Sequence, residues 1–213
     1  MIATAILPVK RLGAAKRRLG TGLDDLQRRD LVLAMAGDVL VAIGEARTVD
    51  RTIVVTGEPG VEEIAVEAGA EVLPDPADAG HSEAALLGIE LAAAAGAGCV
   101  VLLPGDCPML DPRELDNLLT GIPERFVAVV PDRHGSGTNA LVLSPPDAIR
   151  PAFGEGSRER HVEAAREAGL PYSEEGIASL ALDLDTPADI IALTTALDAG
   201  RGRAPRTAKV LGI

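Results

Sequence analysis

The chain alternates short apolar segments with longer mixed ones, and this alternation limits the fold more than any other feature. Cys99–Leu103 is apolar at every position, and Ile2–Leu7 is nearly so. Strands that are buried on both faces have continuous apolar sequences, and helices of roughly 10 to 15 residues between them are typical of a parallel sheet. We therefore expect an α/β fold, a three-layer sandwich with a mostly parallel central sheet.

The expected elements account for most of the chain. Strands are expected at residues 2–7, 52–56, 71–73, 99–103, 126–130, 140–143 and 179–183. Helices are expected at residues 24–44, 60–68, 82–95, 112–119 and 158–168, and from Pro187 onward. Residues 1–199 are predicted to form a single domain. Residues 200–213 are basic and contain glycine and proline, so we expect a mobile C-terminal tail.

No apolar run approaches the roughly 20 residues that a membrane-spanning helix requires. The first apolar stretch is also too short for the core of a signal peptide. We expect a cytoplasmic protein without a membrane partner, and the oligomeric state is left open between a monomer and a homodimer. Cys99 and Cys107 fit neither a metal motif nor a disulfide framework and are expected to be structural.

Positive charge is concentrated at the beginning of the chain. Five Lys and Arg residues follow the first apolar segment, and the net charge through Arg29 is +5 although the whole chain carries −12. A local basic segment on an acidic protein favours a small phosphorylated ligand over a long nucleic acid. Nucleic-acid binding is disfavoured further because the chain has only three aromatic residues to stack on bases.

Acidic residues follow two of the expected strands, where ligands of open α/β sheets bind. Asp106 follows the strand at 99–103, and Asp183 and Asp185 are expected to share a face at the end of the strand at 179–183. Two carboxylates from separate strands, with phosphate oxygens and water, would suit Mg²⁺. The alternative is that Asp185 only favours the start of the helix at Pro187.

A further anion site is indicated at Phe153–Ser157, where two glycines and a hydroxyl precede an expected helix. Free N–H groups at a helix N-terminus bind phosphate or carboxylate, and glycine lets the anion approach closely. The alternative is that Ser157 is an ordinary N-cap. No dinucleotide fingerprint or P-loop motif is present, so side chains are expected to hold most of the phosphate.

Together these motifs resemble the 2-phospho-L-lactate/phosphoenolpyruvate guanylyltransferase family (CofC/FbiD type). The resemblance runs from about residue 2 to residue 198. It rests on five separated segments in the same order, which are Pro8–Leu19, Gly105–Pro108, Gly135–Leu141, Phe153–Ser157 and Asp183–Pro187.

This resemblance implies a nucleotidyltransferase fold and the transfer of GMP from GTP to phosphoenolpyruvate or 2-phospho-L-lactate, in the biosynthesis of the deazaflavin coenzyme F-420. By similarity, Lys10 and Lys16 would hold the GTP phosphates. Ser82, which replaces the residue that relatives often have there, would also bind GTP, near the nucleobase. Asp106 and Asp185 would bind Mg²⁺ and, with Lys16, serve catalysis. The acceptor would be bound by Thr138, Gly154 and Ser157.

The acceptor phosphate is already ionised at pH 7, so attack on GTP requires no general base. His81, His134 and His161 are therefore expected to be structural or peripheral. Two alternatives to the family interpretation are a molybdopterin or isoprenoid nucleotidyltransferase of the same fold and a non-catalytic nucleotide-binding module. Release of pyrophosphate from GTP would distinguish both alternatives from the main interpretation.

Overall fold

The computed structural model describes residues 1–11, 24–75 and 77–213 of the chain. Its strands are β1 (Ala3–Val9), β2 (Arg51–Thr56), β3 (Glu71–Pro74), β4 (Cys99–Leu102), β5 (Phe126–Pro131), β6 (Thr138–Ser144) and β7 (Tyr172–Glu174). Its α-helices are α1 (Asp25–Glu45), α2 (Pro59–Glu67), α3 (His81–Ala94), α4 (Pro112–Leu119), α5 (Ser157–Glu167), α6 (Pro187–Asp198) and α7 (Pro205–Leu211).

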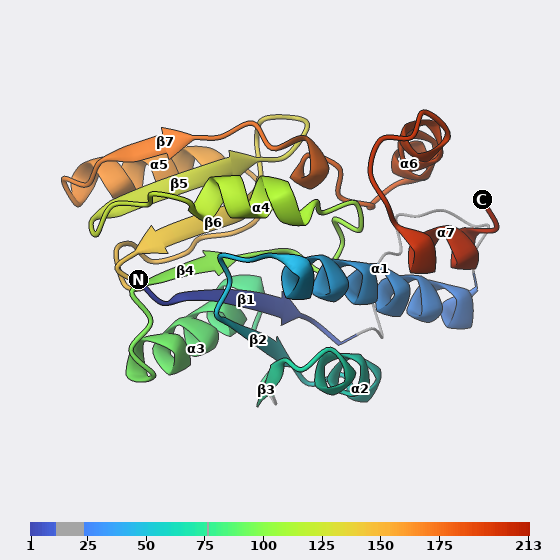
Figure 1. Ribbon diagram of the computed structural model, residues 1–213, viewed down its shortest axis with the longest axis horizontal. Helices are drawn as coiled ribbons and strands as arrows, with labels where there is room; N and C mark the ends of the chain where they lie inside the picture. The colour runs from blue at the N-terminus through green and yellow to red at the C-terminus, as the bar shows by residue number, and fades with distance from the viewer. Residues whose placement is uncertain (12–23, 76) are drawn as a thin grey trace.

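The seven strands form one sheet in the order β3-β2-β1-β4-β6-β5-β7 (Figure 1). Six of the strands run in the same direction. Only β6 runs the other way, so it pairs antiparallel with both of its neighbours, β4 and β5. The predicted α/β fold with a mostly parallel sheet is therefore confirmed. β5 and β6 pair antiparallel across the turn-rich segment that joins them.

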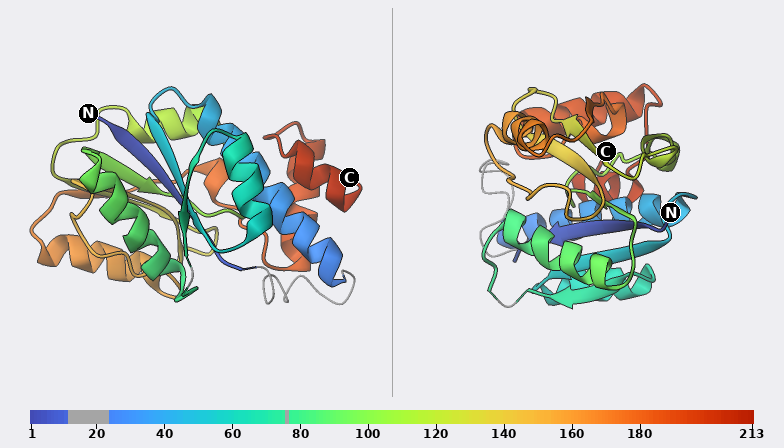
Figure 2. Two further views of the ribbon diagram at one scale, coloured as in Figure 1. Left: turned by 90° about the horizontal axis from the view of Figure 1, so that it is seen from below. Right: turned by 90° about the vertical axis from the view of Figure 1, so that its left-hand side faces the viewer.

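Helices cover both faces of the sheet, because alternate strand side chains point to opposite faces. On one face, Leu7 and Val101 pack with apolar residues of α1, α2 and α4. On the other face, Ile6 and Val100 pack with residues of α3 and α5. Both clusters consist of buried aliphatic side chains, so the central strands are covered on both sides, as their continuous apolar sequences require. Figure 2 shows helices on both sides of the twisted sheet.

Local sequence signals explain where several helices begin. Asp24 and Gln27 form a capping box at the start of α1, and Thr186 and Asp189 form another at the start of α6. Asp111 accepts a hydrogen bond from the Arg113 N–H and so caps the start of α4.

The predicted strand at residues 179–183 is wrong. Ala178–Leu180 forms a single 3₁₀ turn, and residues 181–186 continue without regular structure to α6. The two acidic residues therefore do not share a strand face. Leu180 packs into the core on the face of the sheet that α1, α2 and α4 cover. Leu182 and Leu184 pack into a separate cluster with residues of α1 and α6, so the alternating leucines belong to two different cores.

The end of the chain also differs from the prediction. Residues 205–211 form α7, which packs against α1 beside α6 at one end of the molecule (Figure 1). Thr207 is fully buried there, and the carboxylate of Asp38 in α1 accepts hydrogen bonds from the N–H and the hydroxyl of Thr207 at 2.9 and 2.8 Å. The expectation of a mobile tail is therefore wrong for these residues.

No helix within the described ranges is both long and apolar enough to cross a membrane. Cys99 and Cys107 are buried and not joined in a disulfide, in agreement with a structural role.

Candidate active site

Two predicted site residues, Lys10 and Asp106, follow adjacent parallel strands. In the pairing of β1 with β4, Ile6 lies opposite Leu102. Lys10 and Asp106 are each four residues farther along, so both lie beyond the carboxyl ends of their strands at the same edge of the sheet. This is the edge at which open α/β sheets bind ligands.

His81, the first residue of α3, lies within electrostatic range of both groups. Its pKa is lowered to about 4, mainly by burial; the charge of Lys10 adds to this effect, and the charge of Asp106 opposes it. The structure therefore brings the start of α3 to the same edge as the ends of β1 and β4. His81 is neutral at pH 7.

The loop that carries Asp183 and Asp185 is attached directly to the turn after β4. The N–H of Leu184 donates to the backbone carbonyl of Asp106 at 3.1 Å. The pKa of Asp183 is raised, first by burial and next by the nearby negative charge of Asp106, with a smaller contribution from Asp185. Three carboxylates from two segments thus gather at this edge, although not through a strand.

Asn139 in β6 fixes the position of Asp183. Its side-chain amide donates to the Leu180 carbonyl at 2.7 Å and to a carboxylate oxygen of Asp183 at 3.3 Å. Because Asn139 directly follows Thr138, one strand supports both the acidic residues and the predicted acceptor site.

Asp185 is held from its other side by Asp189. One carboxylate oxygen of Asp189 accepts hydrogen bonds from the N–H groups of Asp185 and Thr186 at 3.0 and 2.6 Å. The other oxygen forms an ion pair with Arg133. These contacts belong to the capping box of α6, and they also fix the backbone of Asp185.

The chemistry of these donors suits a hard divalent cation. Carboxylate oxygens are the usual protein ligands of Mg²⁺, which keeps several waters and takes further oxygens from a bound phosphate. Within the described ranges, no group of three or more His, Cys, Asp or Glu side chains is arranged to hold a metal ion by itself. A magnesium site here would depend on oxygens of the substrate, as the sequence predicts.

The predicted acceptor segment forms a tight loop before α5. The N-cap of α5 is Gly156, in the left-handed region at φ 71°, and Ser157 is the first helical residue. Ser157 is therefore not the N-cap. Its hydroxyl is buried and makes no hydrogen bond to any described residue, so a polar group is left for a ligand to satisfy.

Arg160 holds the backbone of this loop. Its guanidinium donates to the carbonyls of Ala152 at 2.9 Å and Glu155 at 2.6 Å, on either side of Gly154. Gly154 has φ 108°, a conformation that residues with a side chain rarely adopt. The Gly154 carbonyl in turn accepts from the Ser157 N–H at 3.0 Å. The N–H groups of residues 154–156 make no hydrogen bond to any described residue, so they are the backbone donors that the loop can offer an anion.

Thr138 begins β6 and contacts His161 of α5. The Thr138 hydroxyl and His161 Nδ1 lie 3.0 Å apart, and His161 Nε2 accepts a hydrogen bond from the Ala152 N–H at 2.8 Å. The His161 side chain is fully buried. Burial first, and the charge of Arg160 second, lower the pKa of His161 to about 4.

Phe153 connects the two halves of the candidate site. Its N–H donates to the hydroxyl of Ser82 in α3 at 2.9 Å. Its ring lies edge-on between two imidazoles, with centroid distances of 4.6 Å to His81 and 5.2 Å to His161. The predicted nucleotide side and the predicted acceptor side are therefore in direct contact.

The structure thus groups Lys10 with Asp106 and Asp185, and it connects Ser82 to the loop that contains Gly154. Lys16 lies outside the described residues. Sequence reasoning missed Asn139 and Arg160 as supporting residues. It expected His161 to be structural or peripheral, without indicating what the ring contacts. Asn139 adjoins a residue of a recognised motif, which is a usable signal, whereas His161 and Arg160 look like ordinary positions of a helix.

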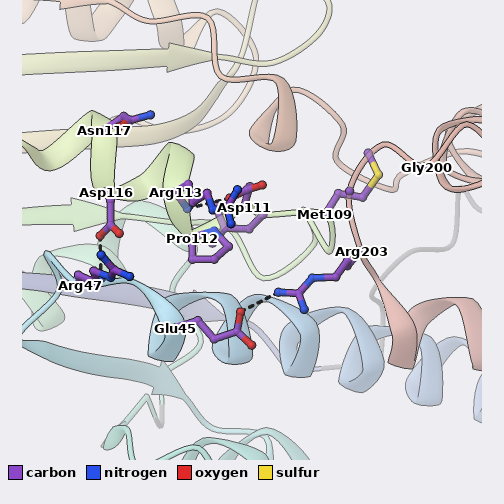
Figure 3. Close-up of a pocket in the computed structure, with 12 residues that line it drawn as sticks. Glu45, Arg47, Met109, Asp111, Pro112, Arg113, Asp116, Asn117, Gly200 and Arg203 are labelled. Atoms are coloured by element: carbon purple, nitrogen blue, oxygen red, sulfur yellow. Dashed lines mark hydrogen bonds and ion pairs between the residues drawn. The ribbon is translucent and has the colours of Figure 1, made fainter.

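A separate cavity of about 840 Å³ lies between the C-terminal end of α1, the start of α4 and the segment before α7 (Figure 3). None of the predicted site residues lines it. Polar groups along its wall bind one another, since Arg203 pairs with Glu45 at 2.7 Å and Asp116 accepts from the Arg47 N–H at 2.7 Å. The cavity is therefore distinct from the candidate active site.

Comparison with known proteins identifies relatives over nearly the whole chain. Residues 3–202 match the family model described as "Guanylyl transferase CofC like". A phosphoenolpyruvate guanylyltransferase of Conexibacter woesei is 47% identical over 99% of this chain and 96% of its own. The protein of the same name from Sphaerobacter thermophilus is 45% identical over 89% of this chain and 91% of its own.

Solved structures support the fold at much lower sequence identity. A nucleotidyl transferase from Methanothermobacter thermautotrophicus aligns with a TM-score of 0.65 at 18% identity and covers 94% of this chain and 99% of its own. A cytidylyltransferase from Leptospira borgpetersenii aligns with a TM-score of 0.60 at 17% identity, over 100% of this chain and 93% of its own. The chain therefore has a nucleotidyltransferase fold.

Proposed function

The chain belongs to the CofC-like guanylyl transferase family, and from that premise we propose that it transfers GMP from GTP to the phosphate of phosphoenolpyruvate. The observation that carries the proposal is the 47% identity, over 99% of the chain, to a protein named phosphoenolpyruvate guanylyltransferase. Sequence similarity of this extent covers both halves of the candidate site, from Lys10 to Asp185.

In the proposed reaction, an oxygen of the acceptor phosphate attacks the α-phosphorus of GTP. A new P–O bond forms, the bond between the α-phosphorus and the bridging oxygen breaks, and pyrophosphate leaves with that oxygen. Because the acceptor phosphate is already ionised, no protein group has to remove a proton. Catalysis then depends on bringing the two anions together and neutralising their charge.

We propose that Lys10 and the basic segment after it, including Lys16, neutralise the triphosphate. Asp106 and Asp185 would hold a magnesium ion together with phosphate oxygens, and Asp183 adds negative charge beside them. When bound, this ion would stabilise negative charge on the phosphate oxygens during transfer. The gathering of carboxylates beside Lys10 supports this assignment.

We assign the acceptor to the other half of the site. Phosphoenolpyruvate carries a phosphate and a carboxylate on the same carbon, so it needs two sets of donors. The N–H groups of Gly154, Glu155 and Gly156 and the hydroxyls of Thr138 and Ser157 would supply them. The buried Ser157 hydroxyl, which makes no hydrogen bond to any described residue, supports this assignment.

The function is tested by pyrophosphate release from the purified chain with Mg²⁺. Each of GTP, ATP, CTP and UTP is paired with phosphoenolpyruvate, 2-phospho-L-lactate and 3-phosphoglycerate. We expect GTP with phosphoenolpyruvate to give the highest kcat/KM. Release of pyrophosphate from CTP with another acceptor, and none from GTP, would instead favour a different nucleotidyltransferase of this fold.

Lys10→Ala tests the nucleotide side within the same assay. Lys10 is exposed after β1, so its replacement should not disturb the core. We expect a rise in the KM for GTP of about tenfold, as for a lost charged contact to phosphate. Lys209→Ala in α7 removes the same charge at an exposed position on another element and serves as the matched control.

A further inference from the structure

His161 makes two hydrogen bonds, and the two together fix which of its nitrogens carries the proton. The Ala152 N–H donates to Nε2 at 2.8 Å, so Nε2 must be unprotonated. A neutral imidazole then carries its proton on Nδ1, which faces the Thr138 hydroxyl at 3.0 Å. A proton on Nε2 would place two N–H groups against each other, so both the other tautomer and the imidazolium are disfavoured.

This tautomer determines the direction of the Thr138 hydroxyl. A hydroxyl has one proton to donate and two lone pairs to accept with. Because His161 Nδ1 donates, Thr138 uses a lone pair for this contact. Its own proton has no acceptor among the hydrogen bonds of the described residues, so it remains available to an anion.

The same imidazole also fixes the loop that carries the other acceptor groups. Ala152, which donates to Nε2, lies two residues before Gly154. Arg158, at the start of α5, binds the segment before Thr138, since its N–H donates to the Ser136 carbonyl at 3.2 Å and its guanidinium to the Gly135 carbonyl at 3.1 Å. Both parts of the predicted acceptor site are therefore attached to α5.

Resting on the function proposed above, we propose that His161 is a positioning residue of the acceptor site. Its Nδ1–H holds the Thr138 oxygen as an acceptor and so directs the threonine proton toward the bound phosphoenolpyruvate, while its Nε2 holds the loop at Ala152. His161 itself touches neither substrate. Its effect on the reaction passes through Thr138 and the loop.

A pair of substitutions separates the two contacts. Asparagine places an amide group near the position of Nδ1, and glutamine places one near Nε2. His161→Gln should keep the contact with Ala152 and lose the one with Thr138. His161→Asn should keep the contact with Thr138 and lose the one with Ala152. We expect His161→Gln to raise the KM for phosphoenolpyruvate about tenfold, with the KM for GTP within about twofold of the wild-type value. His161→Asn should raise the KM for phosphoenolpyruvate less.

A double-mutant cycle tests whether the effect passes through Thr138. Thr138→Val removes the hydroxyl, so adding His161→Gln to it should raise the KM for phosphoenolpyruvate by much less than tenfold. In Thr138→Ser, which keeps a hydroxyl, His161→Gln should again cause the full rise. His134→Gln, at an exposed histidine, is the matched control. An unchanged KM in His161→Gln, or a full tenfold rise on top of Thr138→Val, would overturn the proposal.

Nitrogen NMR of the wild-type imidazoles gives a readout that does not depend on activity or on the folding of variants. We expect His161 to be neutral with its proton on Nδ1 at pH 7. A proton on Nε2, or a charged ring, would overturn the proposal. Wild-type protein that releases no pyrophosphate from GTP and phosphoenolpyruvate would contradict the proposed function instead, and the NMR result would still decide the tautomer.

Discussion

The N–H of Leu184 donates to the carbonyl oxygen of Asp106 at 3.1 Å and joins two loops that are far apart in the sequence. Asp106 follows a central strand, and Leu184 stands between Asp183 and Asp185. The contact holds together the backbones of the two segments that carry the acidic groups, without the involvement of their side chains. Neutral substitution of either carboxylate should therefore leave this frame in place.

The first prediction is that Asp106→Asn and Asp185→Asn each remain folded and lose transfer activity. Asparagine has nearly the size of aspartate, but it removes one negative ligand from the proposed magnesium site. We expect kcat to fall at least about 100-fold, because charge stabilisation in the transition state is lost. Steady-state rates over a Mg²⁺ titration measure this. Activity within about threefold of wild type in either variant would contradict the metal assignment.

The second prediction concerns Ser157, whose hydroxyl is buried and makes no hydrogen bond to any described residue. Ser157→Ala should leave the free energy of unfolding unchanged or raise it by up to about 2 kcal/mol, because an unsatisfied buried polar group is removed. The KM for phosphoenolpyruvate should nevertheless rise at least about tenfold. Urea denaturation and initial rates give the two quantities.

The opposite pattern would contradict this assignment. A loss of stability with an unchanged KM would mean that Ser157 serves the fold and not the acceptor. Ser173→Ala provides a control, since that serine also has a buried hydroxyl without a hydrogen-bond partner among the described residues, but lies on the edge strand β7.

Sequence patterns predicted the elements that are long and periodic. They failed in segments whose conformation depends on contacts with distant parts of the chain. The strands from β1 to β6 and the helices from α1 to α6 follow their apolar spacing and capping residues. Leu180, Leu182 and Leu184 alternate like a strand, but they pack into two separate cores. Helix α7 is too short to show a clear period, and its anchor, Asp38, lies in a distant helix.

The candidate site was predicted from the ends of expected strands and from motifs, because both can be recognised in a short stretch of sequence. The supporting contacts could not be predicted because they join residues from different elements. His161 lies 23 positions after Thr138, and nothing in its helix indicates that its ring is neutral or that Nε2 faces the Ala152 N–H. Burial decides its protonation, and burial is a property of the assembled fold.

The third prediction is a pH dependence of stability caused by His161. Its pKa is about 4 in the folded chain, against 6.5 for an unperturbed histidine. Between these two pH values the unfolded chain binds more protons at His161 than the folded chain does. The contribution of His161 to the free energy of unfolding is therefore complete above about pH 6.5 and is lost as the pH falls toward 4. Between pH 7.5 and pH 4 the free energy of unfolding should fall in both proteins. We expect the fall to be smaller in His161→Gln than in wild type, with a difference of up to about 3 kcal/mol.

Urea denaturation of both proteins at several pH values measures this difference. His81 is shifted in the same direction, so His161→Gln should reduce the pH dependence without abolishing it. Equal slopes for wild type and His161→Gln would show that His161 has an ordinary pKa.

The fourth prediction tests the corrected view of the C-terminus. Asp38 is buried, and its carboxylate accepts hydrogen bonds from the N–H groups of Arg206 and Thr207 and from the Thr207 hydroxyl at 2.8 to 3.1 Å. Asp38→Ala leaves these donors without a partner, so we expect the free energy of unfolding to fall by about 2–4 kcal/mol. Asp147→Ala, at an exposed aspartate, should change it by less than about 0.5 kcal/mol.

Removal of residues 204–213 makes the same test without a point substitution. The deletion uncovers Leu31 and Met35 of α1, which pack with Ala204 in one apolar cluster. It should therefore destabilise the protein at least as much as Asp38→Ala, because apolar burial is lost together with the hydrogen bonds. Combining the two changes should add little, since Asp38 acts on stability through α7. A truncated chain with wild-type stability would mean that these residues form a tail that contributes nothing to the fold.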